Sequence, residues 1–184
     1  ATNEIAPQAL FAAASCRNRA GKHEEAARDL GTLLQKYPAS PLAEEARYQK
    51  AMEEIVLRRD EQAVSSLREF LGKHAGSRFA AESRYWLGVL LDNGGKRVEA
   101  ETELRAAMAE KPEPELDRKI RFQLSLVLQK LGKPDESASL LVPLVSSPEG
   151  ENPKPRNEPK RAGARSIVTC VPVSPSSTAS LEPI

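Results

Sequence analysis

The sequence predicts an all-α solenoid, because it repeats with a fixed period, its apolar residues follow helical spacing, and a turn interrupts each repeat. The period is 37 residues and is seen in four leucines, Leu30, Leu67, Leu104 and Leu141. Such a period is typical of solenoids, since one unit cannot bury its apolar face without a neighbouring unit. We therefore expect four helix-turn-helix units over residues 7–148, after a leader at residues 1–6.

Each unit is expected to contain two helices joined by a tight turn. In the third unit, apolar residues at helical spacing occupy 85–91 and resume at 100–108, with an Asn-Gly-Gly segment between them. The turn glycine recurs in three units, as Gly21, Gly95 and Gly132. Arg58 stands there in the second unit. Because left-handed backbone costs a residue other than glycine about 1 kcal/mol, we expect this turn to differ or to be strained.

Two rows of small residues are expected to let the paired helices approach closely. The row on the first helices is Ala14, Ala51, Gly88 and Ser125, and the row on the second helices is Ala26, Ala63, Ala100 and Ser137. A bulky side chain in either row would push the pair apart, at a cost of about 1 to 3 kcal/mol.

The connections between units carry residues that end and begin helices. Pro38 is expected to end a helix, and Ser40 and Ser77 are expected to cap the helices that follow. Pro112 and Pro114 are expected to stop the third unit and Asp117 to cap the fourth.

After the last repeat the composition changes. Residues 149–184 are rich in proline and serine, so we expect a largely disordered tail that buries little apolar surface. Within it, Ser166–Val173 has the β-branched residues of a strand.

The repeating residues resemble the tetratricopeptide family. In the third unit, the residues at the family's spacings are Leu87, Gly88, Gly95, Ala100, Leu104, Ala107 and Pro112. The common period is about 34 residues. The longer period here, with the connection KYPASPL at 36–42, resembles a variant found in bacterial cell-envelope proteins, such as the TolA-binding coordinator of the Tol-Pal system and the helical lipoprotein of the outer-membrane assembly machine. The resemblance implies a right-handed superhelix whose first helices line a concave groove.

The resemblance places candidate peptide-binding residues on the first helices. They are Phe11, Tyr48, Met52, Ile55, Tyr85, Val89, Phe122 and Leu126. Either this stripe forms an apolar groove for an amphipathic helix or an extended peptide, or it packs between adjacent first helices. The two roles are compatible if each ring buries one face and exposes the other.

A second periodic row consists of Arg47, Arg84 and Arg121. Guanidinium groups in register can bind carboxylates along a partner, or they can pair locally, for example Arg47 with Glu44. Trp86 is the only tryptophan. It is expected either to anchor a partner at the surface or to be partly buried against the neighbouring unit.

No catalytic, metal or cofactor site is expected. His23 and His74 lack the partners of a metal site or a nucleophilic triad, and adjacent glutamates such as Glu53 and Glu54 are expected to lie on solvated helix faces. The net charge is only +1 and acidic residues alternate with basic ones, so no nucleic-acid surface is expected. No apolar run approaches the roughly 18 residues that a membrane span requires.

The sequence therefore predicts a non-catalytic scaffold that binds a protein or peptide, in the bacterial periplasm or cell envelope. One alternative is a cytoplasmic location. Another is a regulatory or substrate-positioning domain excised from a larger enzyme. The start at Ala1 without a methionine is expected for a mature form or an excised piece.

The last helix is expected to mediate self-association. Apolar residues, among them Leu140, Leu141 and Val142, occupy more than one of its sides, whereas terminal repeats normally present a polar outer face. A fifth repeat, a second molecule or Ser166–Val173 would each cover this surface. We favour a homodimer through Leu140 and Val142, because the tail segment offers few apolar side chains and would lose entropy on docking.

Overall fold

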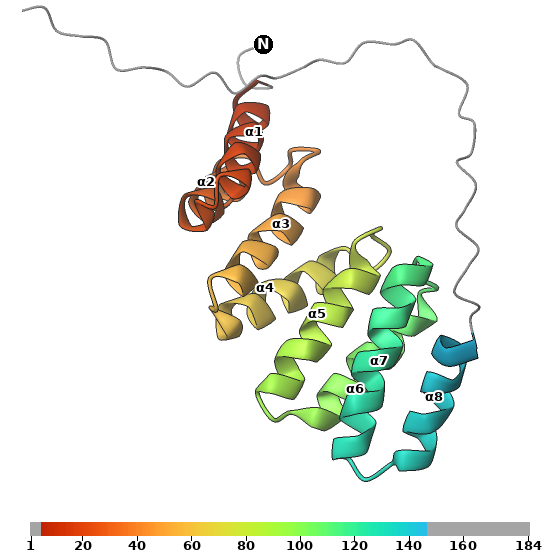
Figure 1. The fold of residues 1–184 in the computed structure, drawn as a ribbon. Helices are drawn as coiled ribbons and strands as arrows, with labels where there is room; N and C mark the ends of the chain where they lie inside the picture. Colours follow the sequence, from red (N-terminus) through yellow and green to blue (C-terminus); the bar gives the residue numbers. More distant parts are fainter. Residues whose placement is uncertain (1–4, 147–184) are drawn as a thin grey trace, which may run out of the picture. The chain divides into compact units, whose positions relative to one another are not determined.

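Eight α-helices form the described part of the chain, residues 5–146 of a computed structural model (Figure 1). In chain order they are α1 (Ile5–Arg19), α2 (His23–Lys36), α3 (Ala43–Val56), α4 (Asp60–Lys73), α5 (Ala80–Asn93), α6 (Arg97–Ala109), α7 (Pro114–Lys130) and α8 (Pro134–Ser146). There is no strand among these residues. The expected tail at 149–184, including Ser166–Val173, lies outside them.

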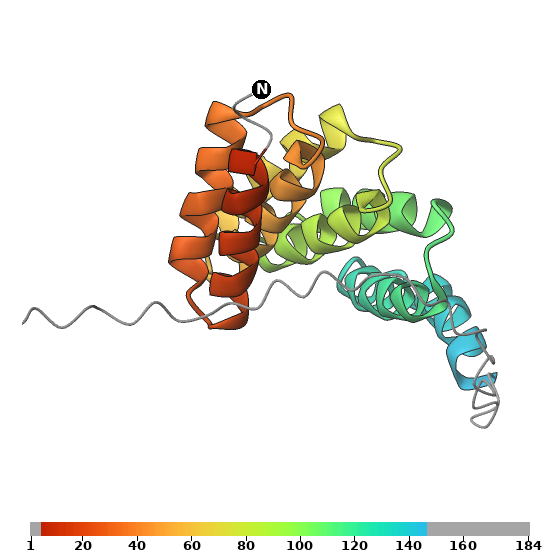
Figure 2. The same ribbon diagram turned by 90° about the horizontal axis from the view of Figure 1, so that it is seen from above.

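The helices form four antiparallel pairs, and each helix packs chiefly against the next one along the chain. Figure 2, turned by 90°, shows each pair rotated relative to the pair before it. The second helices α4, α6 and α8 begin at Asp60, Arg97 and Pro134, so the period of the sequence is also the period of the structure. The expected all-α solenoid of four helical hairpins is confirmed. Among the described residues, no helix has the length and apolar content that a membrane crossing requires.

The turn inside each pair has one residue in the left-handed region. Its φ is +73° at Gly21, +78° at Gly95 and +75° at Gly132. Arg58 takes the same conformation, with φ of +59°, although it carries a side chain. The first of the two outcomes expected for this turn, a different conformation, is therefore wrong, because Arg58 adopts the left-handed conformation of the three glycines.

The connections between pairs differ from the expected caps. Ser40 accepts a hydrogen bond from the backbone N–H of Leu42 (3.2 Å), and Ser77 accepts one from Phe79 (3.1 Å). Both serines therefore stabilise the turn before a helix, and the caps of α3 and α5 are Leu42 and Phe79. The expectation for Asp117 is also wrong, because α7 already begins at Pro114. A proline at the first helical position needs no N–H donor, so it opens this helix without cost.

The two rows of small residues lie where the sequence places them, at the contact between paired helices. All eight are buried: Ala14, Ala51, Gly88, Ser125, Ala26, Ala63, Ala100 and Ser137. The apolar core around them has two parts. One joins α1 and α2 to Ala46 of α3, and the larger one extends from Ala51 of α3 to Leu128 of α7. Helix α3 thus contributes to both parts and connects the first pair to the rest.

The closest approach within a pair occurs at Gly88. A Cβ atom there would lie 2.6 Å from Leu104 Cγ and 2.9 Å from its Cδ2, distances that packed carbon atoms do not reach. Leu104 is fully buried and has no room to retreat. Glycine at this position is therefore required by packing.

We expect Gly88→Ala to lower the free energy of unfolding by about 1 to 3 kcal/mol, through overpacking against Leu104. The matched control is Gly72→Ala in α4, where a Cβ would meet no atom within 4 Å. That variant should gain about 0.5 to 1 kcal/mol by helix propensity. Urea denaturation measures both values. A Gly88→Ala protein as stable as the parent would show that the pair is not closely packed there.

Candidate functional site

Tyr48 lies in the joint between the second and third repeats. Its ring stacks on Phe79 with centroids 4.4 Å apart, and it lies 6.1 Å from the fully buried Phe70. Burial raises the pKa of Tyr48, and a hydrogen bond with Glu82 adds to this shift. The structure therefore places Tyr48 in packing between repeats, the second of the two roles that the sequence allows for this stripe.

The other aromatic residues of the stripe differ in exposure. Phe11 packs against the first part of the core. Tyr85 is half-buried with its ring edge-on to Trp86 (5.2 Å), and burial raises the pKa of Tyr85 although the charge of Lys119 opposes the shift. Phe122, in contrast, is 54% exposed.

The exposure of Phe122 follows from its position at the end of the array. Tyr48 and Tyr85 interact with Glu82 and Lys119, which occupy equivalent positions on the next first helix. One period after Lys119, the position that would face Phe122 is 156, and it lies outside the described residues. Among the described residues no first helix follows α7, and the ring of Phe122 is exposed where those of the earlier repeats are half-buried.

The remaining members of the stripe are partly buried, and one of them lines a hollow. Met52 and Ile55 contact the core, while Val89 and Leu126 are half-buried. Met52 also lines a hollow of about 520 Å³ between α1 and α3. The residues that line this hollow are Ser15, Asn18, Arg19, Gln49, Met52 and Glu53. Val56, one turn beyond Met52 on the same helix, is 54% exposed. The hollow thus lies between two consecutive first helices, where the expected groove would be.

Buried acidic residues form a feature that the sequence did not predict. Glu53 and Glu54 are only 3% and 4% exposed, so the expectation of a solvated face is wrong for them. Glu53 accepts a hydrogen bond from Asn18 Nδ2 (2.5 Å) and lies 2.8 Å from His23 Nδ1. His23 therefore has a carboxylate partner after all, contributed by the next repeat. No sequence signal marks this pair, because its members are 30 residues apart.

A second buried carboxylate links the third repeat to the fourth. Asp92 is 6% exposed, and its Oδ2 accepts hydrogen bonds from Lys130 (2.6 Å) and Gln123 (3.2 Å). Burying a carboxylate is unfavourable unless other groups pair with it, so Glu53 and Asp92 each require the neighbouring repeat to supply their partners. These groups therefore fix the register between repeats.

The three periodic arginines lie in different surroundings. Arg84 Nε donates a hydrogen bond to Glu110 (2.7 Å), and its Nη1 donates one to Glu103 (3.0 Å). Arg121 donates to Asp117 on its own helix (2.5 Å). Both thus pair locally, which is the alternative to partner binding. The expected local pair of Arg47 with Glu44 is not formed. The Nη1 of Arg47 lies instead 3.9 Å from Glu69, beyond hydrogen-bond distance.

Trp86 is half-buried and contacts the core of the third repeat. Its indole Nε1 is buried and has no hydrogen-bond partner among the described residues. The structure therefore favours the partly buried position for this residue.

The histidines of the described part of the chain each lie beside one carboxylate. No group of three or more His, Cys, Asp or Glu side chains is placed there to hold a metal ion. The pairs of His23 with Glu53 and of His74 with Glu44 (3.6 Å) each contain a single carboxylate.

Comparisons with known proteins identify the class of fold. Residues 8–40 match the family model of the tetratricopeptide repeat, a segment that spans α1, α2 and the connection after them. No curated protein matches the sequence. The four helical hairpins are therefore those of a tetratricopeptide-type solenoid, a fold that in general supports protein–protein interactions.

Several similar solved structures are of MamA. MamA from Desulfovibrio magneticus RS-1, from residue 41 to its end, is 15% identical, covers 76% of this chain and 73% of its own, and superimposes with a TM-score of 0.62. MamA AMB-1 is 17% identical over 72% of this chain and 67% of its own, with a TM-score of 0.60. At such identities the likeness shows the fold alone.

Proposed function

We propose that this chain is a non-catalytic scaffold that binds a segment of another protein along its first helices. The observation that carries this proposal is the hollow between α1 and α3, which combines the apolar Met52 with the polar side chains of Arg19 and Gln49. The lining is mainly polar with Met52 as its apolar side chain, so it suits a peptide segment that offers hydrogen-bonding groups around one apolar residue. Val56, four residues after Met52 on α3, is a further exposed apolar side chain of the first helices.

The chemistry of the hollow favours a peptide with one apolar anchor and flanking polar groups. Met52 has a flexible, polarisable side chain that adapts to different partners. Arg19 is exposed at the rim and offers a charge-assisted hydrogen bond to a carboxylate or a backbone carbonyl. Tyr48 helps to position α3, which contributes Gln49, Met52 and Glu53 to the hollow, because its ring stacks on Phe79 of the next connection.

Affinity capture with the full chain tests this function. Val56→Lys should reduce the recovery of a bound partner by about tenfold, because a charge replaces an apolar contact at a site that is already exposed. The matched control is Val98→Lys in α6, where the valine is 69% exposed. Equal recovery with both variants would contradict binding at the first helices. Circular dichroism of each variant checks that the fold is kept.

We propose a location in the bacterial periplasm or cell envelope. The support is the 37-residue period together with the connection KYPASPL at 36–42, which resembles the envelope variant of the repeat. Fractionation of the native cells checks it. Recovery with the periplasmic or membrane-associated fraction is expected, and recovery with the cytoplasmic fraction would contradict it.

We also propose that the chain forms a homodimer through its last repeat. Arg68 and Arg105 each reach a glutamate of the next second helix, Glu99 at 2.6 Å and Glu136 at 2.5 Å. The equivalent residue of α8 is Val142, which is 60% exposed. The face of the last repeat that would continue the array thus exposes Val142 and Phe122. The same face of a second copy would cover both side chains in a two-fold symmetric contact.

Leu140, in contrast, is half-buried and packs against the core, so its replacement would test folding and not association. We expect the parent chain to sediment as a dimer at micromolar concentration and Val142→Glu to sediment as a monomer. Val98→Glu, at an exposed site of α6, should remain dimeric. A parent chain that is monomeric at high micromolar concentration would contradict the proposal, as would a dimer that Val142→Glu leaves intact.

A further inference from the structure

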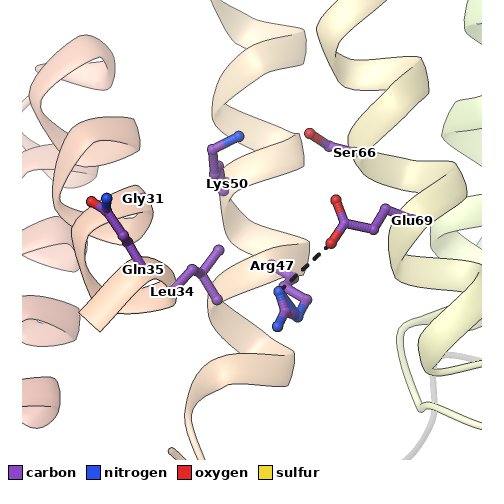
Figure 3. Close-up of a pocket in the computed structure, with 7 residues that line it drawn as sticks. All are labelled: Gly31, Leu34, Gln35, Arg47, Lys50, Ser66 and Glu69. Atoms are coloured by element: carbon purple, nitrogen blue, oxygen red, sulfur yellow. Dashed lines mark ion pairs between the residues drawn. The ribbon is translucent and has the colours of Figure 1, made fainter. Parts of the chain in front are cut away.

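A second pocket lies on a different part of the surface, between the second helices α2 and α4 with α3 beneath (Figure 3). Its volume is about 250 Å³. The lining residues are Gly31, Leu34, Gln35, Arg47, Lys50, Ser66 and Glu69. Arg47 and Lys50 both contribute positive charge to it. The pocket is thus separate from the hollow between the first helices and has a different chemistry.

The equivalent arginine of the next repeat shows what Arg47 lacks. Arg84 is held by Glu103 and Glu110, at 3.0 and 2.7 Å. One period earlier these positions are occupied by Ser66 and Lys73. The second repeat therefore has a hydroxyl and an ammonium group where the third repeat has two carboxylates.

Glu69 does not replace the two missing carboxylates. It lies 3.9 Å from Arg47 Nη1, while it accepts a hydrogen bond from Lys73 at 2.7 Å. The bond from Lys73 is the main cause of the lowered pKa of Glu69, and the charges of Arg47 and Lys50 contribute less. Arg47 Nε is buried and has no hydrogen-bond partner among the described residues. Arg47 is thus the least paired of the three periodic arginines.

Gly31 leaves the α2 side of the pocket without a side chain at this position. The later repeats have Arg68 and Arg105 at this position, whereas a Cβ on Gly31 would meet only Lys50 Cε, at 4.0 Å. Lys50 is itself peculiar to this repeat, since the equivalent residue of the third repeat is the buried Leu87. Lys50 pairs with Glu54. Arg47, Lys50 and Lys73 together carry one positive charge more than Glu54 and Glu69.

We propose that this pocket binds a carboxylate of a protein partner, with the Arg47 guanidinium as its principal contact. Ionised acceptors form the strongest hydrogen bonds with arginine, and the planar guanidinium matches a carboxylate in shape. The Ser66 hydroxyl and the Gln35 amide are further donors at the rim. The bound carboxylate takes the place that Glu103 has beside Arg84. The proposal rests on the scaffold function only in that the carboxylate belongs to a protein, and it involves none of the residues of the hollow.

The test uses Ser66→Glu in the full chain. This substitution gives the second repeat the carboxylate that the third repeat has at Glu103, so a side chain of the protein itself occupies the proposed site. The probes are two short acetylated alanine peptides. One carries an internal glutamate and an amidated C-terminus, and the other has no acidic side chain and a free C-terminus. The measured quantity is the shift of the Arg47 Nε–Hε NMR signal during titration, with the signals of Arg84 and Arg121 as internal controls.

We expect at least one peptide to shift the Arg47 signal in the parent chain, and the peptide that does so distinguishes a side-chain carboxylate from a C-terminal one. Ser66→Glu should abolish the response and raise the melting temperature, whereas Glu103→Ser should lower the melting temperature and leave the Arg47 response intact. No shift with either peptide at tens of millimolar would overturn the proposal. An unchanged response in Ser66→Glu would overturn it too. Val56→Lys should respond as the parent does, so failure of the hollow and failure of this pocket are distinguishable.

Discussion

The structure depends on the close contact of the two helices within each repeat. Gly88 of α5 illustrates this contact, because its Cα lies so near the Leu104 side chain that a Cβ atom would not fit between them. Ala14, Ala51 and Ser125 hold the same place in the other repeats, all of them almost completely buried. When the paired helices are this close, each hairpin is thin and its remaining apolar surface faces the next hairpin. Stacking of the repeats follows from that geometry, since an isolated hairpin would leave the surface in water.

Contacts between repeats add specificity to this apolar packing. Glu53 meets Asn18 and His23 of the first repeat, and Asp92 meets Gln123 and Lys130 of the fourth. Buried carboxylates contribute little net stability, because their removal from water offsets much of the pairing energy. They do penalise a wrong register, in which a charge would be left without a partner. Tyr48, stacked on Phe79, has a similar role in the joint between the second and third repeats.

Differences between repeats create the candidate sites. The helices and turns recur with little change, so any position can be compared with its equivalents one period away. Arg84 is fully paired within its repeat, while Arg47 faces a pocket. Arg105 pairs with Glu136 of the next second helix, while Val142 at the equivalent position of α8 is exposed. A scaffold built from near-identical units acquires binding surfaces where one unit departs from the pattern.

The sequence by itself determined the number of repeats, the pairing of their helices, the two rows of small residues and the positions of the turns. These features are local or periodic, so residue type and spacing report them directly. Only the tertiary structure decided that Tyr48 packs between repeats, that Glu53 is buried and that Arg47 differs from Arg84. A period gives the place of a residue within its unit, but burial and pairing depend on side chains that the neighbouring unit contributes. Glu53 and His23 meet because two repeats stack, and neither residue carries in its own sequence surroundings any sign of the other.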